Sequence, residues 1–220
     1  MCGRYTLTQP VDDIAARFLA DMAHIGVLPP RPNISPTEPL LAIRAAAGGG
    51  REACWLRWGL APPWLDARGP RPINARAETA AARPMFREAL RARRALLPAD
   101  GFYEWRAAGR RKQPVRFGLA GGGLFAFGAI WELRRTPQGT EETACILTTG
   151  ANGLVSPVHD RMPVILSPED EGRWLDPTLP PNAVAALLMP FAAERMTAVD
   201  VDPRALRPAA PPGPLLGGSA

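Results

Sequence analysis

The alternation of apolar and polar residues predicts a domain built mainly from short strands. Apolar stretches separated by Gly- or Pro-rich turns recur from the N-terminus to about residue 200. We expect strands at 3–8, 40–45, 53–58, 95–97, 101–105, 115–119, 124–131, 143–148, 164–166 and 196–201. Because no internal repeat or linker interrupts this pattern, we expect one α+β domain dominated by antiparallel strands, arranged as half-open barrel-like sheets with short flanking helices.

Helical spacing is confined to a few short segments. Residues 11–19 follow Pro10 with apolar positions on one face, and Ser167-Pro168-Glu169-Asp170 is typical of a helix start. Further helices are expected after residue 79 and at 86–94, 167–175 and 182–188, whereas the Pro-rich stretch 26–37 predicts an extended loop. The stretch 203–220 is rich in Pro, Ala and Gly, so we expect a domain over 2–202 and a disordered tail.

Basic residues are concentrated in the first part of the chain. The net charge is +5, with 19 Arg or Lys against 10 Asp or Glu in residues 1–120, and 7 against 11 in residues 121–220. A basic half is typical of a protein that binds a polyanion such as nucleic acid. Nearly all of these residues are Arg, in a chain rich in Ala, Gly and Pro, so compositional bias explains the excess equally well.

Cysteine usage and hydropathy indicate a cytoplasmic protein. The three cysteines form no CxxC pair, which argues for a reducing compartment and against a disulfide framework or a metal site. Cys54 and Cys145 lie in apolar runs, where we expect inert core residues. Neither a signal peptide nor an apolar run long enough to span a membrane is recognisable, so no membrane contact is expected.

Cys2 offers chemistry that an internal cysteine lacks. Removal of Met1, normal before so small a residue, leaves an α-amine and a thiol on adjacent carbons. The amine has a pKa of about 7.7–8.0, so part of it is a free nucleophile at neutral pH. It can form an imine with an aldehyde, onto which the thiol closes as a thiazolidine; alternatively, the thiol attacks a carbonyl with the amine as base. An accidental Cys at a frayed terminus is the structural alternative.

Three residues are candidates to assist Cys2. His159 lies in a polar segment between two prolines and has the pKa range of a proton shuttle. Glu104 is surrounded by aromatic residues in an expected strand, so burial should raise the pKa of its carboxyl. Asn74, at an expected junction between strand and helix, is the third candidate. The residues leave a structural alternative open for each: His159 as a loop residue, Glu104 as a solvated residue of an edge strand, and Asn74 as a helix cap.

Six motifs in one order resemble a known family. They are Cys2-Gly3-Arg4-Tyr5, Asn33-Ile34-Ser35-Pro36, Trp58-Gly59-Leu60-Ala61-Pro62, Ile73-Asn74-Ala75-Arg76-Ala77-Glu78-Thr79, Gly101-Phe102-Tyr103-Glu104-Trp105 and His159-Asp160-Arg161-Met162-Pro163. Together, over about residues 2–200, they are similar to the SRAP (SOS-response-associated peptidase) family, whose members shield abasic sites in single-stranded DNA. Two positions depart from the family pattern: Ser35 precedes Pro36 where Ala is usual, and Asp200 follows Val199 where Asn is frequent.

The resemblance implies an enzyme of the DNA damage response that joins itself to the lesion. Cys2 would be the nucleophile that forms a thiazolidine with the ring-opened abasic sugar, and Asn74, Glu104 and His159 match the other catalytic positions. Contacts to single-stranded DNA are implied for Arg4, Asn33, Trp58, Trp64, Arg76 and Arg161. No cofactor or metal is implied, and the expected protein is a monomer that associates with the nucleoid when bound to DNA.

Two other classes of function remain open from the residues. One is an N-terminal-nucleophile cysteine amidohydrolase or peptidase, in which the thiol of Cys2 attacks an amide. The other is a non-catalytic module that binds single-stranded DNA through the same Arg and Trp residues. Substitution of Cys2 separates the three, because an amidohydrolase loses turnover, a binding module loses nothing, and an SRAP-type protein loses only covalent capture.

Overall fold

The computed structural model describes residues 2–66, 68–109, 111–137 and 139–206. The strands are β1 (Tyr5–Leu7), β2 (Ala20–Asp21), β3 (Arg31–Ile34), β4 (Pro39–Ala45), β5 (Arg51–Trp58), β6 (Asn74–Arg76), β7 (Arg94–Ala99), β8 (Gly101–Ala108), β9 (Arg111–Leu119), β10 (Phe125–Thr136), β11 (Gly139–Gly150), β12 (Arg161–Pro163), β13 (Ile165–Leu166) and β14 (Met196–Asp200). The helices are α1 (Val11–Phe18), α2 (Ala77–Ala80), α3 (Arg87–Ala92), α4 (Pro168–Leu175) and α5 (Pro181–Ala186), with short 3₁₀ turns η1 (Ala193–Arg195) and η2 (Pro203–Leu206).

The larger sheet closes into a barrel. Its strands follow the order β11-β10-β7-β4-β5, and β5 returns to pair with β11 in parallel, with Arg57 opposite Thr143. Closure leaves these barrel strands without a free edge, which protects them from pairing with another chain. The α+β class and the dominance of antiparallel pairing are confirmed, and the closure goes further than the predicted half-open sheets.

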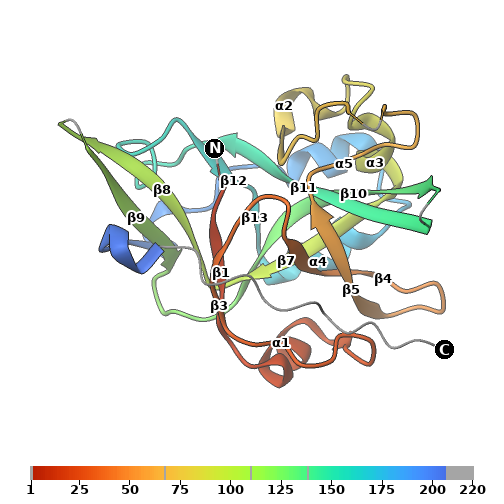
Figure 1. Cartoon of the computed structure of the whole chain (residues 1–220), viewed down its shortest axis with the longest axis horizontal. Coiled ribbons are helices and arrows are strands. Elements are labelled where there is room, and N and C mark those ends of the chain that lie inside the picture. The colour runs from red at the N-terminus through yellow and green to blue at the C-terminus, as the bar shows by residue number, and fades with distance from the viewer. Residues whose placement is uncertain (1, 67, 110, 138, 207–220) are drawn as a thin grey trace.

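A second, open sheet lies against the barrel. It has the strand order β14-β9-β8-β1-β3. Aromatic side chains fill the space between the two sheets: Phe127 of β10 makes edge-to-face contacts with Tyr5 of β1 and Phe102 of β8. In Figure 1 the β8–β9 hairpin and the β10–β11 hairpin extend toward opposite sides of the molecule, and α1 covers one end. The N-terminal strand β1 therefore belongs to the open sheet, between β8 and β3, and its Tyr5 packs against the barrel.

Local sequence signals account for most of these elements. The amphipathic segment after Pro10 forms α1, whose Ile14 and Phe18 are buried, and the segment after Ser167 forms α4. The hydroxyl of Ser167 does not cap the backbone of α4 but donates to the carboxylate of Asp170 at 3.1 Å. The helix expected after residue 79 is the single turn α2, which begins and ends earlier than predicted.

The structure differs from the predictions in two extended regions. The Pro-rich stretch 26–37 contains β3, which pairs with β1. Residues 203–206 were expected to belong to the disordered tail but form η2, in which Leu206 is buried. The remainder of that predicted tail, 207–220, lies outside the described residues. No helix within the described ranges is long and apolar enough to span a membrane.

Candidate active site and nucleic-acid interface

The strand β1 fixes the position of the N-terminal segment. Tyr5 lies between Ile34 of β3 and Phe102 of β8. Its ring is fully buried and makes edge-to-face contacts with Trp58 and Phe127, at ring-centroid distances of 5.6 and 5.5 Å. Because Tyr5 is held by neighbours on both strands and by the core, the residues that precede it follow a defined path beside β8.

Asn74 holds the backbone of Cys2. It begins β6, which pairs in parallel with β11 so that Asn74 lies opposite Ile146. Its side-chain Nδ2 donates a hydrogen bond of 2.9 Å to the carbonyl of Cys2. The buried Oδ1 of Asn74 has no hydrogen-bond partner within the described part of the chain. Since the N-cap of α2 is Arg76, Asn74 is not the helix cap that the sequence left open.

The thiol of Cys2 is enclosed. Its side chain is fully buried, and its Sγ donates a long hydrogen bond of 3.9 Å to the carbonyl of Arg4. Burial raises the pKa of the thiol well above its ordinary value, and the negative charge of Glu104 raises it further. In this state Cys2 is a protonated thiol, which is a weak nucleophile until a neighbouring group accepts its proton.

Glu104 has the perturbed carboxyl expected from its aromatic surroundings. It lies in the middle of β8 and is only 3% exposed. Burial raises the pKa of the Glu104 carboxyl, while the positive charges of the chain's amino terminus and of His159 oppose this rise. A carboxyl whose pKa is raised keeps a proton at a higher pH than a solvated one, so it can serve as a general acid and, after donating, as a base.

His159 is positioned by its immediate neighbours. Its Nδ1 accepts a hydrogen bond of 3.0 Å from the backbone N–H of Arg161, and the same atom lies 2.9 Å from a carboxylate oxygen of Asp160. In the neutral ring, acceptance at Nδ1 places the proton on Nε2. When Nδ1 carries a proton, it can donate to the carboxylate of Asp160 instead. These two neighbours fix the orientation of the imidazole ring.

A pocket of about 370 Å³ is lined by two of the predicted catalytic residues and by two residues that the sequence did not indicate as functional. It is lined by Glu104, Trp105, Lys112 and His159. The first and last are the candidate acid and base. Trp105 follows Glu104 directly in its motif, and Lys112 is the single lysine of the chain. The scarcity of lysine was the one signal that marked Lys112 in advance.

The strand β11 brings the distant parts of the site together. On one side it pairs with β6, which carries Asn74, and on the other with β12, which begins at Arg161 directly after the His159 turn. Asn74 and His159 therefore flank the carboxyl end of one strand, while Cys2 and Glu104 come from the neighbouring open sheet. All four predicted catalytic residues meet where the two sheets face each other.

Arg4 and Asn33 form a linked pair. The guanidinium of Arg4 donates to Oδ1 of Asn33 at 2.9 Å, and Nδ2 of Asn33 donates to the carbonyl of Leu206 at 2.9 Å. The oxygen and the nitrogen of the Asn33 amide are therefore both hydrogen-bonded within the protein. Through them Asn33 holds the guanidinium of Arg4 and connects η2 to β3. A DNA contact by Arg4 stays a prediction, and the geometry gives Asn33 the role of orienting it.

Arg161 and Arg76 differ in how far they are engaged. Arg161 makes a two-pronged ion pair with Glu78, at 2.7 and 2.8 Å, and also donates to the carbonyl of Thr148. This ion pair lowers the pKa of the Glu78 carboxyl. Arg76 lies near the same carboxylate and is exposed. Of the two predicted phosphate contacts, Arg76 has the freer guanidinium.

The two tryptophans of the aromatic segment have opposite environments. Trp58 is 1% exposed, and its indole N–H donates to the carbonyl of Ile73 at 2.9 Å. A base cannot reach this ring, so the expected DNA contact by Trp58 is replaced by a structural role beneath Tyr5. Trp64 is 62% exposed, and its role in stacking stays a prediction.

The charge difference between the two halves of the sequence is largely compensated by folding. Arginines from the first half pair with acidic residues from the second: Arg17 and Arg51 with Glu171, Arg44 with Glu142, Arg71 with Glu141, Arg93 with Glu132, and Arg106 with Asp200. Glu171 is buried between its two partners. The net basic excess therefore overstates the number of cations available to a polyanion.

The other cysteines and possible metal ligands add no site. Cys145 is buried as predicted, whereas Cys54 is only partly buried, and burial raises its pKa to about 11. No cluster of His, Cys, Asp or Glu suited to a metal ion occurs in the ranges that the structure describes.

Comparison with known proteins places the chain in a family. Residues 1–207 match the family described as SOS response associated peptidase (SRAP). The abasic site processing protein YoqW of Bacillus subtilis is 42% identical over 207 residues, covering 91% of this chain and 92% of that protein. The abasic site processing protein YedK of Escherichia coli is 34% identical over 183 residues, covering 80% and 79% of the two chains.

A solved structure agrees with this placement. A protein from Bacteroides thetaiotaomicron has a TM-score of 0.86 and 27% identity to this chain, covering 95% of this chain and all of that one. The six sequence motifs, the closed barrel with its adjoining sheet, and the family match over nearly the whole described chain lead to one conclusion: this protein is a member of the SRAP family.

Proposed function

We propose that this protein binds abasic sites in single-stranded DNA and captures them covalently through Cys2, as part of the cytoplasmic response to DNA damage. The observation that carries the proposal is the convergence on Cys2: Asn74 binds its carbonyl, the Glu104 charge acts on its thiol, and His159 shares a pocket with Glu104. Two relatives, YoqW and YedK, are named abasic site processing proteins, which supports the same substrate.

The first step is the opening of the sugar ring. An abasic site exists mostly as a closed hemiacetal, so its aldehyde is released only when one proton leaves the anomeric hydroxyl and another reaches the ring oxygen. Glu104 and His159 are the acid and base for this exchange. Burial raises the pKa of Glu104, which favours the protonated form needed to donate.

The α-amine of mature Cys2 reacts before the thiol. With its pKa raised by burial, the thiol is protonated, whereas part of the amine is neutral at physiological pH. The amine nitrogen adds to the aldehyde carbon, and loss of one water gives the imine. The thiol sulfur then bonds to the imine carbon, its proton ends on the nitrogen, and a thiazolidine results. The net change is aldehyde plus aminothiol to ring plus water. Asn74 holds the carbonyl of Cys2 and so positions the residue, and the proposed steps use no cofactor.

We assign single-stranded DNA binding to three arginines and one tryptophan outside the catalytic set. Arg4, oriented by Asn33, together with Arg76 and Arg161 would contact phosphates, and Trp64 would stack on a base, a contact worth about 1–3 kcal/mol. We propose that the protein acts as a monomer, since the catalytic groups all come from one chain.

The decisive experiment incubates the mature protein with an oligonucleotide that carries one abasic site. We expect a complex that resists denaturation, with the DNA remnant located on Cys2 by mass spectrometry. A remnant on Lys112 or on another cysteine contradicts the proposal. A variant with an untrimmed residue ahead of Cys2 keeps the thiol but converts the amine to an amide, so it should fail to cross-link. If it cross-links as well as the wild type, a thiol-only hydrolase becomes the better description.

A further inference from the structure

The pocket beside Glu104 lies at an open edge of β8. The strand β1 pairs with β8 only near Phe102, and the backbone hydrogen bonding along this edge ends with the bond of 2.9 Å from the N–H of Tyr103 to the carbonyl of Arg4. Beyond that point β8 pairs with β9 alone among the described strands. Glu104 and Trp105 are neighbours in the strand, so their side chains lie on opposite faces of the hairpin. Both nevertheless line the pocket at this open edge.

The pocket is large enough for a small molecule. A volume of about 370 Å³ lies within the range of about 300–1,000 Å³ that is typical of small-molecule sites. The reacting sugar occupies the part next to Glu104 and His159, since these two supply its proton exchange. The remaining wall consists of Trp105 on β8 and Lys112 on β9, to which the proposed chemistry assigns no role.

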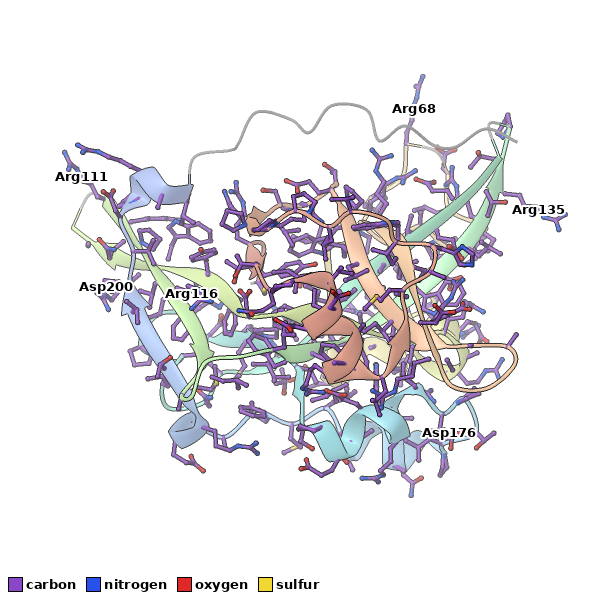
Figure 2. The ribbon with its side chains drawn as sticks, turned by 90° about the horizontal axis from the view of Figure 1, so that it is seen from below. Arg68, Arg111, Arg116, Arg135, Asp176 and Asp200 are labelled. Atoms are coloured by element: carbon purple, nitrogen blue, oxygen red, sulfur yellow. The ribbon has the colours of Figure 1, made fainter. Side chains whose placement is uncertain are left out.

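Lys112 is an available cation at this wall. Its side chain is exposed and makes no hydrogen bond or ion pair within the described residues. Arg106, on the same hairpin, is instead engaged by both carboxylate oxygens of Asp200, at 2.9 and 2.8 Å. Figure 2 shows Arg111 at the outer end of the hairpin and Asp200 on the adjacent β14. Asp200 thus neutralises Arg106, whereas Lys112, at the wall of the pocket, carries a charge that is unpaired among the described residues.

We propose that Lys112 and Trp105 form a subsite for the nucleotide next to the lesion, with Lys112 binding its phosphate and Trp105 packing against its sugar or base. The inference rests on the proposed function and adds which part of the substrate enters the pocket. An ammonium on a flexible stem binds phosphate as a point charge. A phosphate held there sets the distance of the abasic sugar from Glu104 and His159, so it contributes to binding and not to the chemical step.

The test measures covalent capture of an abasic oligonucleotide as a function of DNA concentration and salt. For Lys112→Gln we expect half-saturation at about tenfold higher DNA concentration, an unchanged maximal rate, and a salt slope reduced by about 0.7, the value of one phosphate on a single strand. Lys112→Arg keeps the charge and should retain most of the affinity. Arg135→Gln removes an exposed cation at the opposite end of the molecule (Figure 2) and should change neither value. Arg106→Gln removes a neutralised cation and should change the slope less than Lys112→Gln.

Two substrate changes identify the phosphate. Replacing the linkage on one side of the lesion by an uncharged methylphosphonate should weaken wild-type capture as much as Lys112→Gln, and the two changes together should cost no more than either alone. Capture of free 2-deoxyribose, which has no phosphate, should be equal in wild type and variant. The proposal is overturned if Lys112→Gln slows capture of 2-deoxyribose or leaves the salt slope unchanged. It is also overturned if Lys112→Gln weakens capture equally whether the neutral linkage stands on the 5′ side of the lesion, on its 3′ side or on neither. Failure of the wild type to capture any abasic DNA refutes the proposed function instead.

Discussion

The side-chain amide of Asn74 donates a hydrogen bond of 2.9 Å to the backbone carbonyl of Cys2. The two residues are far apart in the sequence, and the contact joins the closed barrel, through β6, to the segment that enters the open sheet. It fixes the residue whose amine and thiol are the proposed nucleophiles, while the buried Oδ1 of Asn74 has no hydrogen-bond partner among the described residues.

Removing this donor should slow capture without unfolding the protein. A hydrogen bond of this kind contributes about 1 kcal/mol, which corresponds to an effect of about fivefold when it positions a reacting group. We expect Asn74→Ala and Asn74→Asp to reduce the capture rate by about that factor or more, because both lack the N–H donor. Single-turnover rates and thermal unfolding check this. If Asn74→Asp retained the wild-type rate, the donor would be irrelevant and only the size of the side chain would matter.

Glu104→Gln should slow capture and stabilise the fold at the same time. A positioned general acid contributes about 10²–10⁴ to a rate, so we expect a loss of at least about 100-fold. Burial raises the pKa of Glu104 above its ordinary 4.5 in the folded protein, so ionisation opposes folding. The free-energy cost of ionising Glu104 in the folded protein is absent below pH 4.5, grows as the pH rises, and reaches its full value above the folded-state pKa. The unfolding free energy of the variant should therefore exceed that of the wild type at neutral pH and approach it at low pH. Equal free energies at all pH values contradict the burial argument.

Cys2→Ser should separate the two nucleophiles. The variant keeps the α-amine, so it should still form the imine, but a hydroxyl closes the ring far less readily than a thiol. We expect little stable adduct on its own and efficient cross-linking when borohydride reduces the imine. Denaturing electrophoresis with and without reductant measures both. A stable adduct without reductant shows that ring closure by sulfur is dispensable.

Arg76→Gln should weaken DNA binding without affecting stability. Arg76 is exposed, and it acts on Glu78 only at a distance, since Arg161 makes the direct ion pair. We expect the salt slope of non-covalent binding to fall by about 0.7 and the melting temperature to stay constant. Arg161→Gln is the matched comparison: it should also destabilise the fold, by about 1 kcal/mol, because it releases Glu78 and Thr148. An unchanged slope for Arg76→Gln removes this residue from the DNA interface.

Trp64→Ala should weaken DNA binding, whereas Trp58→Phe should lower the stability of the fold. Trp64 is exposed, so its loss should leave the unfolding free energy within about 0.5 kcal/mol of the wild type and weaken binding of single-stranded DNA by about 1–3 kcal/mol. Trp58 is buried against Tyr5, and the smaller ring also loses the hydrogen bond to Ile73, so its replacement should destabilise the fold. Chemical denaturation and fluorescence titration distinguish the two. The assignment is wrong if Trp64→Ala binds DNA as tightly as the wild type.

The elements that the sequence predicted correctly depend on neighbouring residues. The helix α1 follows from apolar spacing after Pro10, α4 from the residues after Ser167, and the β4–β5 hairpin from the glycines at 48–50 between two apolar runs. The raised pKa of Glu104 also followed locally, because the aromatic residues beside it in the strand indicated burial. The candidate set itself came from residue types and the order of motifs, which are properties of the sequence alone.

What only the tertiary structure decided are contacts between distant segments. The parallel pairing of β5 with β11 closes the barrel, and β11 then places Asn74 and His159 on either side of itself; no local pattern specifies which strands pair across such separations. Trp58 and Trp64 share one aromatic segment, yet packing buried the first and exposed the second. The basic first half looked like a polyanion site, but ion pairs with the second half engage many of its arginines. Residue type determined which groups were chemically able to act, and the strand pairing determined which of them meet, because strand pairing joins residues that are remote in the chain.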